Sequence, residues 1–209
     1  MTTLTLIRHG ETDWNAKRRI QGQLDVPLNE VGRAQADAIA QRFRDDAVDV
    51  LLSSDLSRAM QTMQAIASAC GLPVLSDSRL RERKLGVLEG LYYDEAREKM
   101  PLLLDVFQNR QIDTPLDGGE SLREFAQRVI GFLTETAETY ASKRIVAVTH
   151  GGVVDIAWRH ATGKPLDAPR DFAIHNTSVS VFRIEGSKFH LVNEADLSHL
   201  PAGNSIDNA

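Results

Sequence analysis

The sequence predicts an α/β protein built as a three-layer α/β/α sandwich with a mostly parallel central sheet. Short aliphatic runs at residues 4–7, 48–52 and 145–148 end abruptly, which is typical of strands covered on both faces of a sheet. Amphipathic segments long enough to form helices separate these runs. Strands that alternate with helices favour parallel pairing, because each crossover helix returns the chain to the edge where it started.

The first two helices are predicted from the residues at which they start. Asn29 can cap a helix that extends to Phe43 and carries one apolar stripe. Ser54 or Asp55 can cap a second helix, which extends to about residue 69. These helices supply the connections that a parallel sheet requires.

Two further helices are predicted in the second half of the chain. Ser121 and Glu124 form an S-x-x-E capping box at the start of one of them. The other begins after His150 and ends at Gly163. The sandwich therefore has candidate helices for both of its outer layers.

Two remaining segments have different patterns. Residues 91–117 are less regular, and we expect them to form a small helical excursion over the sheet edge, called here the cap segment. Alternating residues at 179–184 and 189–192 flank a glycine-containing turn and predict a β-hairpin. The exposed edge of such a hairpin could support a homodimer.

Length and composition fit one catalytic domain. The chain has 209 residues, of which 42% are hydrophobic, enough for a core without disulfide support. We expect residues 1–200 to form this domain and residues 201–209 to be a frayed tail. The 24 Lys and Arg residues against 29 Asp and Glu residues give a net charge of −5, which argues against a nucleic-acid partner.

The sequence also indicates a cellular setting. The single cysteine, Cys70, excludes an intramolecular disulfide and a cysteine-based metal cluster. No run approaches the ~20 apolar residues of a membrane span, and no secretory signal pattern is visible. We therefore expect a cytoplasmic protein with no membrane partner.

Polar and basic residues follow the predicted strands. Arg8, His9 and Gly10 follow the first strand, and His150 and Gly151 follow the strand at 145–148. In an open α/β sheet, ligands bind outside the carboxyl ends of the strands, so we expect these residues to lie together. Glycine after each histidine allows a sharp turn and a close approach to backbone N–H groups.

The ligand is predicted to be an anion. Arg58 lies in the first turn of its helix, where the helix dipole disfavours a cation, which suggests that it faces a negative charge. Helix N-termini after Ser54 and His150 would add N–H donors. Residues 79–84 contain four basic side chains and one carboxylate. Together these features predict a phosphoryl group.

Residues 6–15, LIRHGETDWN, carry a motif that identifies a family. This segment resembles the signature of the histidine phosphatase superfamily, also called phosphoglycerate mutase-like. Matching motifs follow in order and cover most of the chain from residue 4 to about residue 184, at residues 21–22, 25–28, 32–36, 54–59, 80–83, 118–121, 148–152 and 176–178.

The resemblance implies a phosphomonoester hydrolase that acts through a phosphohistidine intermediate on a small phosphorylated metabolite, without a metal or another cofactor. His9 is then the nucleophile. Its reactive ring nitrogen must be neutral, so we expect the other nitrogen to donate to a backbone carbonyl or a similar acceptor. Glu82 is the general acid for the leaving oxygen and then the base that activates water.

The resemblance also implies a set of groups that hold the phosphate. Arg8 and Arg58 would bind its oxygens with planar, bidentate donors. His150 would donate to the equatorial oxygens as charge redistributes. Further substrate-binding positions are implied at Asn15, Gln21, Gly22, Arg83 and the N–H of Gly151.

An alternative within the same superfamily is a cofactor-dependent phosphoglycerate mutase. It would need a 2,3-bisphosphoglycerate primer and would return the phosphoryl group to another hydroxyl. Mutases of this family carry a longer insertion between the acidic residue and the second histidine, with extra basic residues. The cap segment offers Arg97, Lys99 and Arg110 but no adjacent basic pair. A phosphatase is therefore the preferred interpretation.

Two alternatives come from other classes. A metal-dependent hydrolase could use His9, His150 and Glu82 as ligands, but two neighbouring arginines would repel the cation. A binding module without turnover is the other, although every matched core residue is present. The substrate stays open, and Arg18 and Arg19 could meet a second anionic group. The remaining histidines match no motif and are assigned surface or core roles: His160, His175, His190 and His199.

Overall fold

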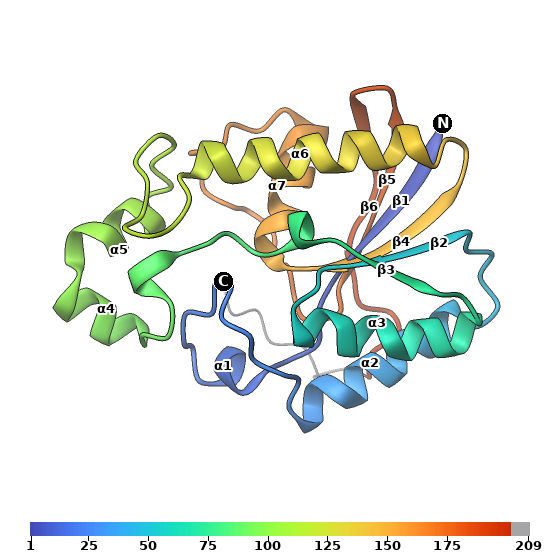
Figure 1. Ribbon diagram of the computed structural model, residues 1–209, viewed down its shortest axis with the longest axis horizontal. Coiled ribbons are helices and arrows are strands. Elements are labelled where there is room, and N and C mark those ends of the chain that lie inside the picture. Colours follow the sequence, from blue (N-terminus) through green and yellow to red (C-terminus); the bar gives the residue numbers. More distant parts are fainter. Residues whose placement is uncertain (202–209) are drawn as a thin grey trace.

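The computed structural model describes residues 1–201, in which six strands form one central sheet. The spatial order is β3-β2-β4-β1-β5-β6 (Figure 1). The four strands from β3 to β1 are parallel, β5 pairs antiparallel with β1, and β6 pairs antiparallel with β5. The strands are β1 (Thr2–Arg8), β2 (Val50–Ser53), β3 (Val74–Ser76), β4 (Arg144–Thr149), β5 (Val179–Glu185) and β6 (Lys188–Asp196).

Helices cover both faces of the sheet, which confirms the predicted α/β sandwich. Helices α2 (Glu30–Phe43) and α3 (Ser57–Cys70) pack on one face, and α6 (Leu122–Thr139) and α7 (Gly151–Thr162) pack on the other (Figure 1). Because neighbouring side chains of a strand point to opposite faces of the sheet, β4 contributes to the apolar clusters on both faces. Ile145 and Ala147 join the apolar cluster under α6 and α7, whereas Val146 and Val148 join the cluster under α2 and α3.

Most helix starts and ends lie where the sequence predicted them. The Asn29 side chain accepts from the N–H of Gly32 at 2.8 Å. Ser121 and Glu124 form the expected capping box. Gly163 ends α7 in the left-handed conformation, with φ of 72°.

The prediction for the start of α3 is wrong. Leu56 is the N-cap residue and its side chain makes no capping bond. Asp25, from a distant loop, accepts instead from the N–H of Ser57 at 2.7 Å and from its hydroxyl at 2.6 Å. Ser54 is fully buried and its hydroxyl lies 2.8 Å from a ring nitrogen of His150. A tertiary contact has therefore replaced the local cap.

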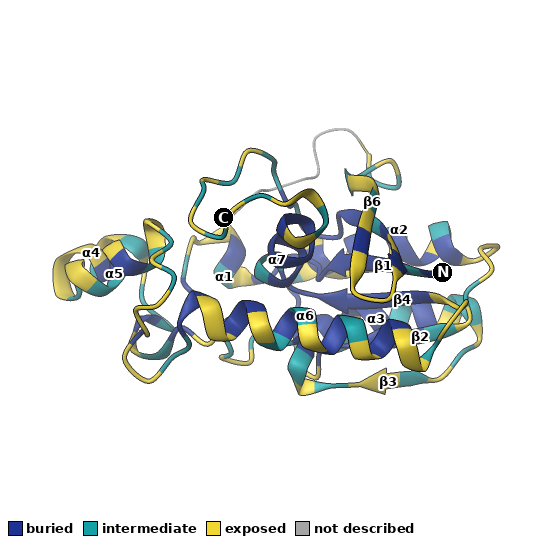
Figure 2. Cartoon of the chain, turned by 90° about the horizontal axis from the view of Figure 1, so that it is seen from above, coloured by how far each residue is buried: buried dark blue, intermediate teal, exposed yellow. Residues whose placement is uncertain are grey.

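The cap segment is helical, as expected, and contains α4 (Tyr93–Lys99) and α5 (Pro101–Gln108). These two helices protrude from one end of the molecule and are largely exposed (Figure 2). Their inward side chains pack on a separate small apolar cluster that includes Ile20, Leu88 and Leu104. The cap segment thus has its own packing layer beside the main core.

The C-terminal segment forms the predicted hairpin of β5 and β6 around Gly186. The expected tail at 201–209 lies outside the described residues except for Pro201. Within residues 1–201, no helix is long and apolar enough to cross a membrane.

Candidate active site

A cavity of about 480 Å³ lies at the carboxyl ends of the parallel strands. The ten residues that the sequence singled out for catalysis or substrate binding all line it: Arg8, His9, Asn15, Gln21, Gly22, Arg58, Glu82, Arg83, His150 and Gly151. They come from helices, strands and connecting loops that are far apart in the sequence. The structure thus brings these residues together in one cavity at the carboxyl ends of the strands, where ligands bind in open α/β sheets.

His9 lies just beyond β1 and is only 3% exposed. Its Nδ1 lies 2.7 Å from the carbonyl oxygen of Gly10, and because a carbonyl can only accept, Nδ1 must carry the proton. Burial, followed by the nearby charges of Arg58 and Arg8, holds the pKa of His9 well below its ordinary value. The ring is therefore neutral, with the lone pair on Nε2, which is the state a nucleophile requires.

Residues outside the segment 6–15 hold the loop that contains His9 in place. The hydroxyl of Thr62 accepts from the N–H of Gly10 at 3.0 Å, and Asn176 donates to the carbonyl of His9 at 2.9 Å. A Cβ on Gly10 would lie 2.5 Å from the carbonyl oxygen of Gly32, so this close approach needs glycine. No sequence motif marks Thr62. Asn176 belongs to a matching motif, which was the available signal.

Arg58 is 1% exposed and its orientation depends on a loop. Its two terminal nitrogens donate to the carbonyl oxygens of Leu24 at 2.8 Å and Gly22 at 2.7 Å. Burial lowers the pKa of Arg58 to about 10, although Glu82 and Asp25 act in the opposite direction. The guanidinium therefore remains charged at neutral pH and lines the cavity.

His150 is the N-cap residue of α7 and is fully buried. Its ring centre lies 5.1 Å from that of His9, at an angle of 61°. Burial and the charge of Arg58 hold the pKa of His150 well below its ordinary value. Gly151 follows at the first position of α7, so a helix N-terminus faces the cavity beside both histidines.

The carboxylate of Glu82 is fixed by backbone N–H groups. One oxygen accepts from Arg83 at 2.8 Å and the other accepts from Gly152 at 2.9 Å. A Cβ on Gly152 would lie 2.1 Å from Oε1 of Glu82, so only glycine allows this contact. Gln23 and Arg128, which sequence analysis missed, donate to the carbonyl of Glu82. The acidic group is therefore held at a defined place on the cavity wall.

Only one arginine of the basic run at 79–84 reaches the cavity. Arg83 is buried, donates to the carbonyl of Glu120, and has its pKa lowered by burial to about 10. Arg79 pairs with Asp77 and Glu135 on the surface, and Arg81 pairs with Asp55. Of the positive charge that the sequence places at residues 79–84, Arg79 and Arg81 therefore contribute to the surface and not to the cavity.

Asn15 and Gln21 combine local roles with their place at the cavity. Oδ1 of Asn15 accepts from the N–H of Thr12 at 3.1 Å, which completes a capping box at the short helix α1 (Asp13–Ala16). The Thr12 hydroxyl donates to Oε1 of Gln21 at 3.0 Å. Asn15 thus takes part in the cap of α1 and also lies on the cavity wall.

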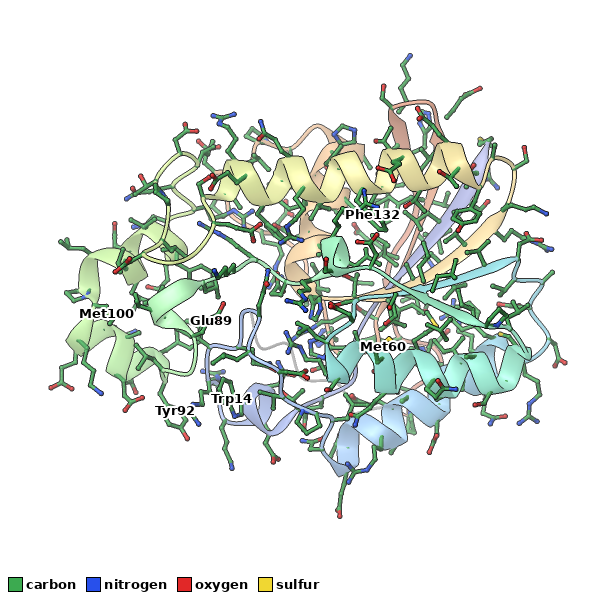
Figure 3. All side chains as sticks on the ribbon, viewed as in Figure 1. Trp14, Met60, Glu89, Tyr92, Met100 and Phe132 are labelled. Atoms are coloured by element: carbon green, nitrogen blue, oxygen red, sulfur yellow. The ribbon has the colours of Figure 1, made fainter. Side chains whose placement is uncertain are left out.

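Arg18 and Arg19, the suggested contacts for a second anionic group, differ. The Arg19 guanidinium lies 4.3 Å from the ring of Trp14 and 5.3 Å from that of Tyr92, and it donates to the carbonyl of Gly90 at 2.5 Å. Figure 3 shows Trp14 and Tyr92 close together at the base of the cap segment. Both arginines line the cavity, but Arg19 joins the N-terminal loop to this segment, whereas Arg18 is exposed.

The part of the cavity wall that the cap segment and the loop after α7 supply consists of residues that no motif marked. Tyr93 and Phe107 come from the cap segment, and Arg170 comes from the loop after α7. Arg110 is held by Asp155 at 2.7 Å and by the carbonyl of Leu166 at 2.6 Å. Arginines outnumber carboxylates among the described lining residues, so the cavity suits an anion. No group of three or more metal-ligating side chains occurs in the described part of the chain.

Comparison with known proteins agrees with this geometry. Residues 4–196 match the family model of the histidine phosphatase superfamily, branch 1. The chain is 43% identical to phosphoglycerate mutase-like protein 4 of Arabidopsis thaliana, over 94% of this chain and 86% of the relative. It is 39% identical to the metal-independent phosphoserine phosphatase of the same plant, over 96% and 84%.

A solved structure has the same fold. The phosphoserine phosphatase of Entamoeba histolytica, determined in complex with 3-phosphoglyceric acid, superposes with a TM-score of 0.85 at 28% identity. The match covers 96% of this chain and all of that one (100%). Fold, site and sequence agree, and the chain belongs to the histidine phosphatase superfamily, branch 1.

Proposed function

We propose that this protein hydrolyses phosphomonoesters of small metabolites through a phosphohistidine at His9. The observation that carries the proposal is the state of the His9 ring: Nδ1 is bonded to the Gly10 carbonyl, so the lone pair is on Nε2, in a cavity lined by three buried arginines. Membership of a phosphatase superfamily and the phosphoserine phosphatase relatives support it.

In the first step, the substrate phosphate lies among Arg8, Arg58 and the N-terminus of α7. Nε2 of His9 attacks phosphorus, and the bond from phosphorus to the leaving oxygen breaks. Glu82 gives its proton to that oxygen, which leaves as an alcohol. The two guanidinium groups and His150 stabilise the charge that develops on the equatorial oxygens.

In the second step, water removes the phosphoryl group from His9. The Glu82 carboxylate takes a proton from water as its oxygen bonds to phosphorus, and the phosphorus–nitrogen bond breaks. The products are inorganic phosphate, a neutral His9 and a protonated Glu82, so the cycle closes. Two fixed arginines supply positive charge at the phosphate, and the proposal therefore requires no metal.

The preferred substrates are phosphomonoesters that carry a second anionic group. Arg18, Arg110 and Arg170 line the cavity together with the cap-segment aromatics Tyr93 and Phe107. The cavity volume of about 480 Å³ limits the ligand to a small molecule. Relatives named for phosphoserine and phosphoglycerate agree with a ligand that bears both a phosphate and a carboxylate.

The test is a phosphate-release assay on protein treated with EDTA. Substrates are p-nitrophenyl phosphate, phosphoserine and 3-phosphoglycerate, each with and without 2,3-bisphosphoglycerate, for wild type and His9→Ala. We expect release that persists in EDTA and disappears in the variant. Isomerisation to 2-phosphoglycerate with little free phosphate would establish the mutase alternative instead. No turnover of any substrate would leave only a binding function.

A further inference from the structure

Loop 21–24 decides where the guanidinium of Arg58 lies. Arg58 donates to two carbonyl oxygens of this loop, at Gly22 and Leu24. Both terminal nitrogens are used in this way, so a displacement of either carbonyl would rotate or shift the whole planar group. The groups that fix the loop are therefore coupled to phosphate binding.

The Glu89 carboxylate holds loop 21–24 through contacts outside the cavity. Its Oε1 accepts from the N–H of Gln23 at 3.0 Å and from the N–H of Leu85 at 2.8 Å. A Cβ on Gly22, which has φ of 51°, would lie 2.2 Å from the same oxygen, so the carboxylate packs directly against the Gly22 backbone. Gly22 lines the cavity and Glu89 does not. Glu89 therefore contacts the loop without contacting a ligand.

The surrounding contacts connect Glu89 to the cap segment. Gly90 donates to the carbonyl of Ile20 at 2.8 Å, and Ile20 donates to the carbonyl of Leu91 at 2.9 Å. Figure 3 shows Glu89 at the base of the cap segment, on the side of Trp14 and Tyr92. The charge of Glu89 also raises the pKa of Arg58 against the effect of burial. Hydrogen bonding and charge thus act on the same arginine.

We propose that Glu89 is a positioning residue that holds loop 21–24 so that the Gly22 and Leu24 carbonyls aim Arg58 at the phosphoryl group. The inference rests on the proposed function, because it takes Arg58 as a phosphate ligand. The base of the cap segment then contributes to phosphate binding as well as to the choice of substrate.

The test compares Glu89→Ala with Glu89→Gln. Alanine removes the acceptor and leaves two N–H groups without it, so we expect inorganic phosphate to bind about tenfold more weakly in calorimetry. Glutamine keeps an acceptor oxygen of the same reach, so we expect phosphate affinity within about twofold of wild type. Glu98→Ala, which removes an exposed carboxylate of α4, is the matched control.

A double-mutant cycle distinguishes positioning from general destabilisation. In an Arg58→Lys background, Glu89→Ala should weaken phosphate binding by less than about twofold further, because the group it positions is gone. A full tenfold loss in that background, or an equal loss in Glu89→Gln, would overturn the proposal. If Glu89→Ala does not fold, Glu89→Asp, whose carboxylate is one methylene short of Gln23, replaces it in the same cycle.

Calorimetry with phosphate needs no turnover, so the two proposals can fail separately. Absence of phosphatase activity in wild type, with tight phosphate binding and the expected cycle, would overturn the proposed function and retain the role of Glu89. Normal phosphatase activity in wild type, with unchanged phosphate affinity in Glu89→Ala, would overturn the role of Glu89 and retain the proposed function.

Discussion

The two ends of the cavity are built in different ways. At the phosphate end, His9, Arg58 and His150 are each at most 3% exposed and extend from strand ends and helix N-termini within the main core. At the other end, the cap segment has two short helices on a small apolar cluster, and its Leu102 is 81% exposed. The groups that we propose for the chemistry are thus buried in the main core, whereas the cap segment, which we propose contacts the rest of the substrate, has only a small apolar cluster of its own.

The difference also concerns what each end can tolerate. Glycines pack against backbone or carboxylate atoms at the phosphate end, as Gly10 and Gly152 show, so added atoms there must displace a functional group. The cap segment contributes side chains such as Tyr93 and Phe107 to the cavity wall. We therefore expect substitutions at these two positions to affect substrate preference more than the phosphoryl chemistry.

The largest expected effect is the loss of the nucleophile. His9→Ala should reduce turnover of every phosphomonoester by at least about 10⁴-fold, because no other described cavity residue except His150 offers a neutral ring nitrogen. Steady-state assays with p-nitrophenyl phosphate measure the loss. The control His190→Ala changes an exposed histidine on β6. Turnover by His9→Ala within about tenfold of wild type would remove His9 from the mechanism.

A smaller loss should follow from one added methyl group at the phosphate end. Gly152→Ala places a Cβ 2.1 Å from Oε1 of Glu82 and should displace the acid, with kcat falling about 10²-fold. A series of aryl phosphates tests this. The loss should be greatest for leaving groups of high pKa, which need proton donation most, and Glu82→Gln should show the same trend.

Gly131→Ala is the matched control for this substitution. Gly131 lies inside α6, and a Cβ there meets no atom within 4 Å. Its activity should equal that of wild type. Equal slowing of all aryl phosphates by Gly152→Ala would show that the methyl group acts on folding or phosphate binding and not on the acid.

At the cap end we expect an effect on recognition and not on chemistry. Arg18→Ala should raise KM for 3-phosphoglycerate about fivefold, because an exposed charged hydrogen bond is lost. KM for p-nitrophenyl phosphate, which has no second anionic group, should stay within about twofold. Arg97→Ala, on the outer face of α4, is the control. Parallel changes in KM for both substrates would contradict the division between the two ends.

The smallest expected effect is on stability in acid. The pKa of His9 and of His150 in the folded protein lies well below 6.5, and that of His199 is lowered to about 4 by burial. Below pH 6.5 the unfolded chain therefore binds more protons than the folded chain, and stability decreases as the pH falls from 6.5 toward 4. The cap segment contains no histidine and adds nothing to this dependence through that residue type.

Thermal unfolding midpoints at pH 7 and pH 5 measure this dependence. His199→Gln should reduce the difference between the two midpoints, because one group that takes up a proton on unfolding is removed. An unchanged difference would show that His199 is not protonated preferentially in the unfolded chain.

Local patterns carried much of the prediction. The aliphatic runs identified β1 and β4, because strands covered on both faces need apolar residues in succession. Asn29, Ser121 and Gly163 marked helix ends through bonds or dihedral angles that depend on near neighbours. The motif around His9 and the histidine at the end of β4 identified the phosphate end, because both lie at strand ends that a parallel sheet brings together.

Long-range contacts were decided only by the tertiary structure. No local pattern shows that Asp25 caps α3, that Arg81 turns outward to Asp55, or that Arg19 packs between Trp14 and Tyr92. The residues that the cap segment and the loop after α7 supply to the cavity wall, among them Tyr93 and Arg170, were likewise unmarked. The physical reason is that a hydrogen bond or an ion pair depends on distance in space. The sequence therefore pointed to the groups that we propose for the chemistry, and the fold determined how they are held and what surrounds them.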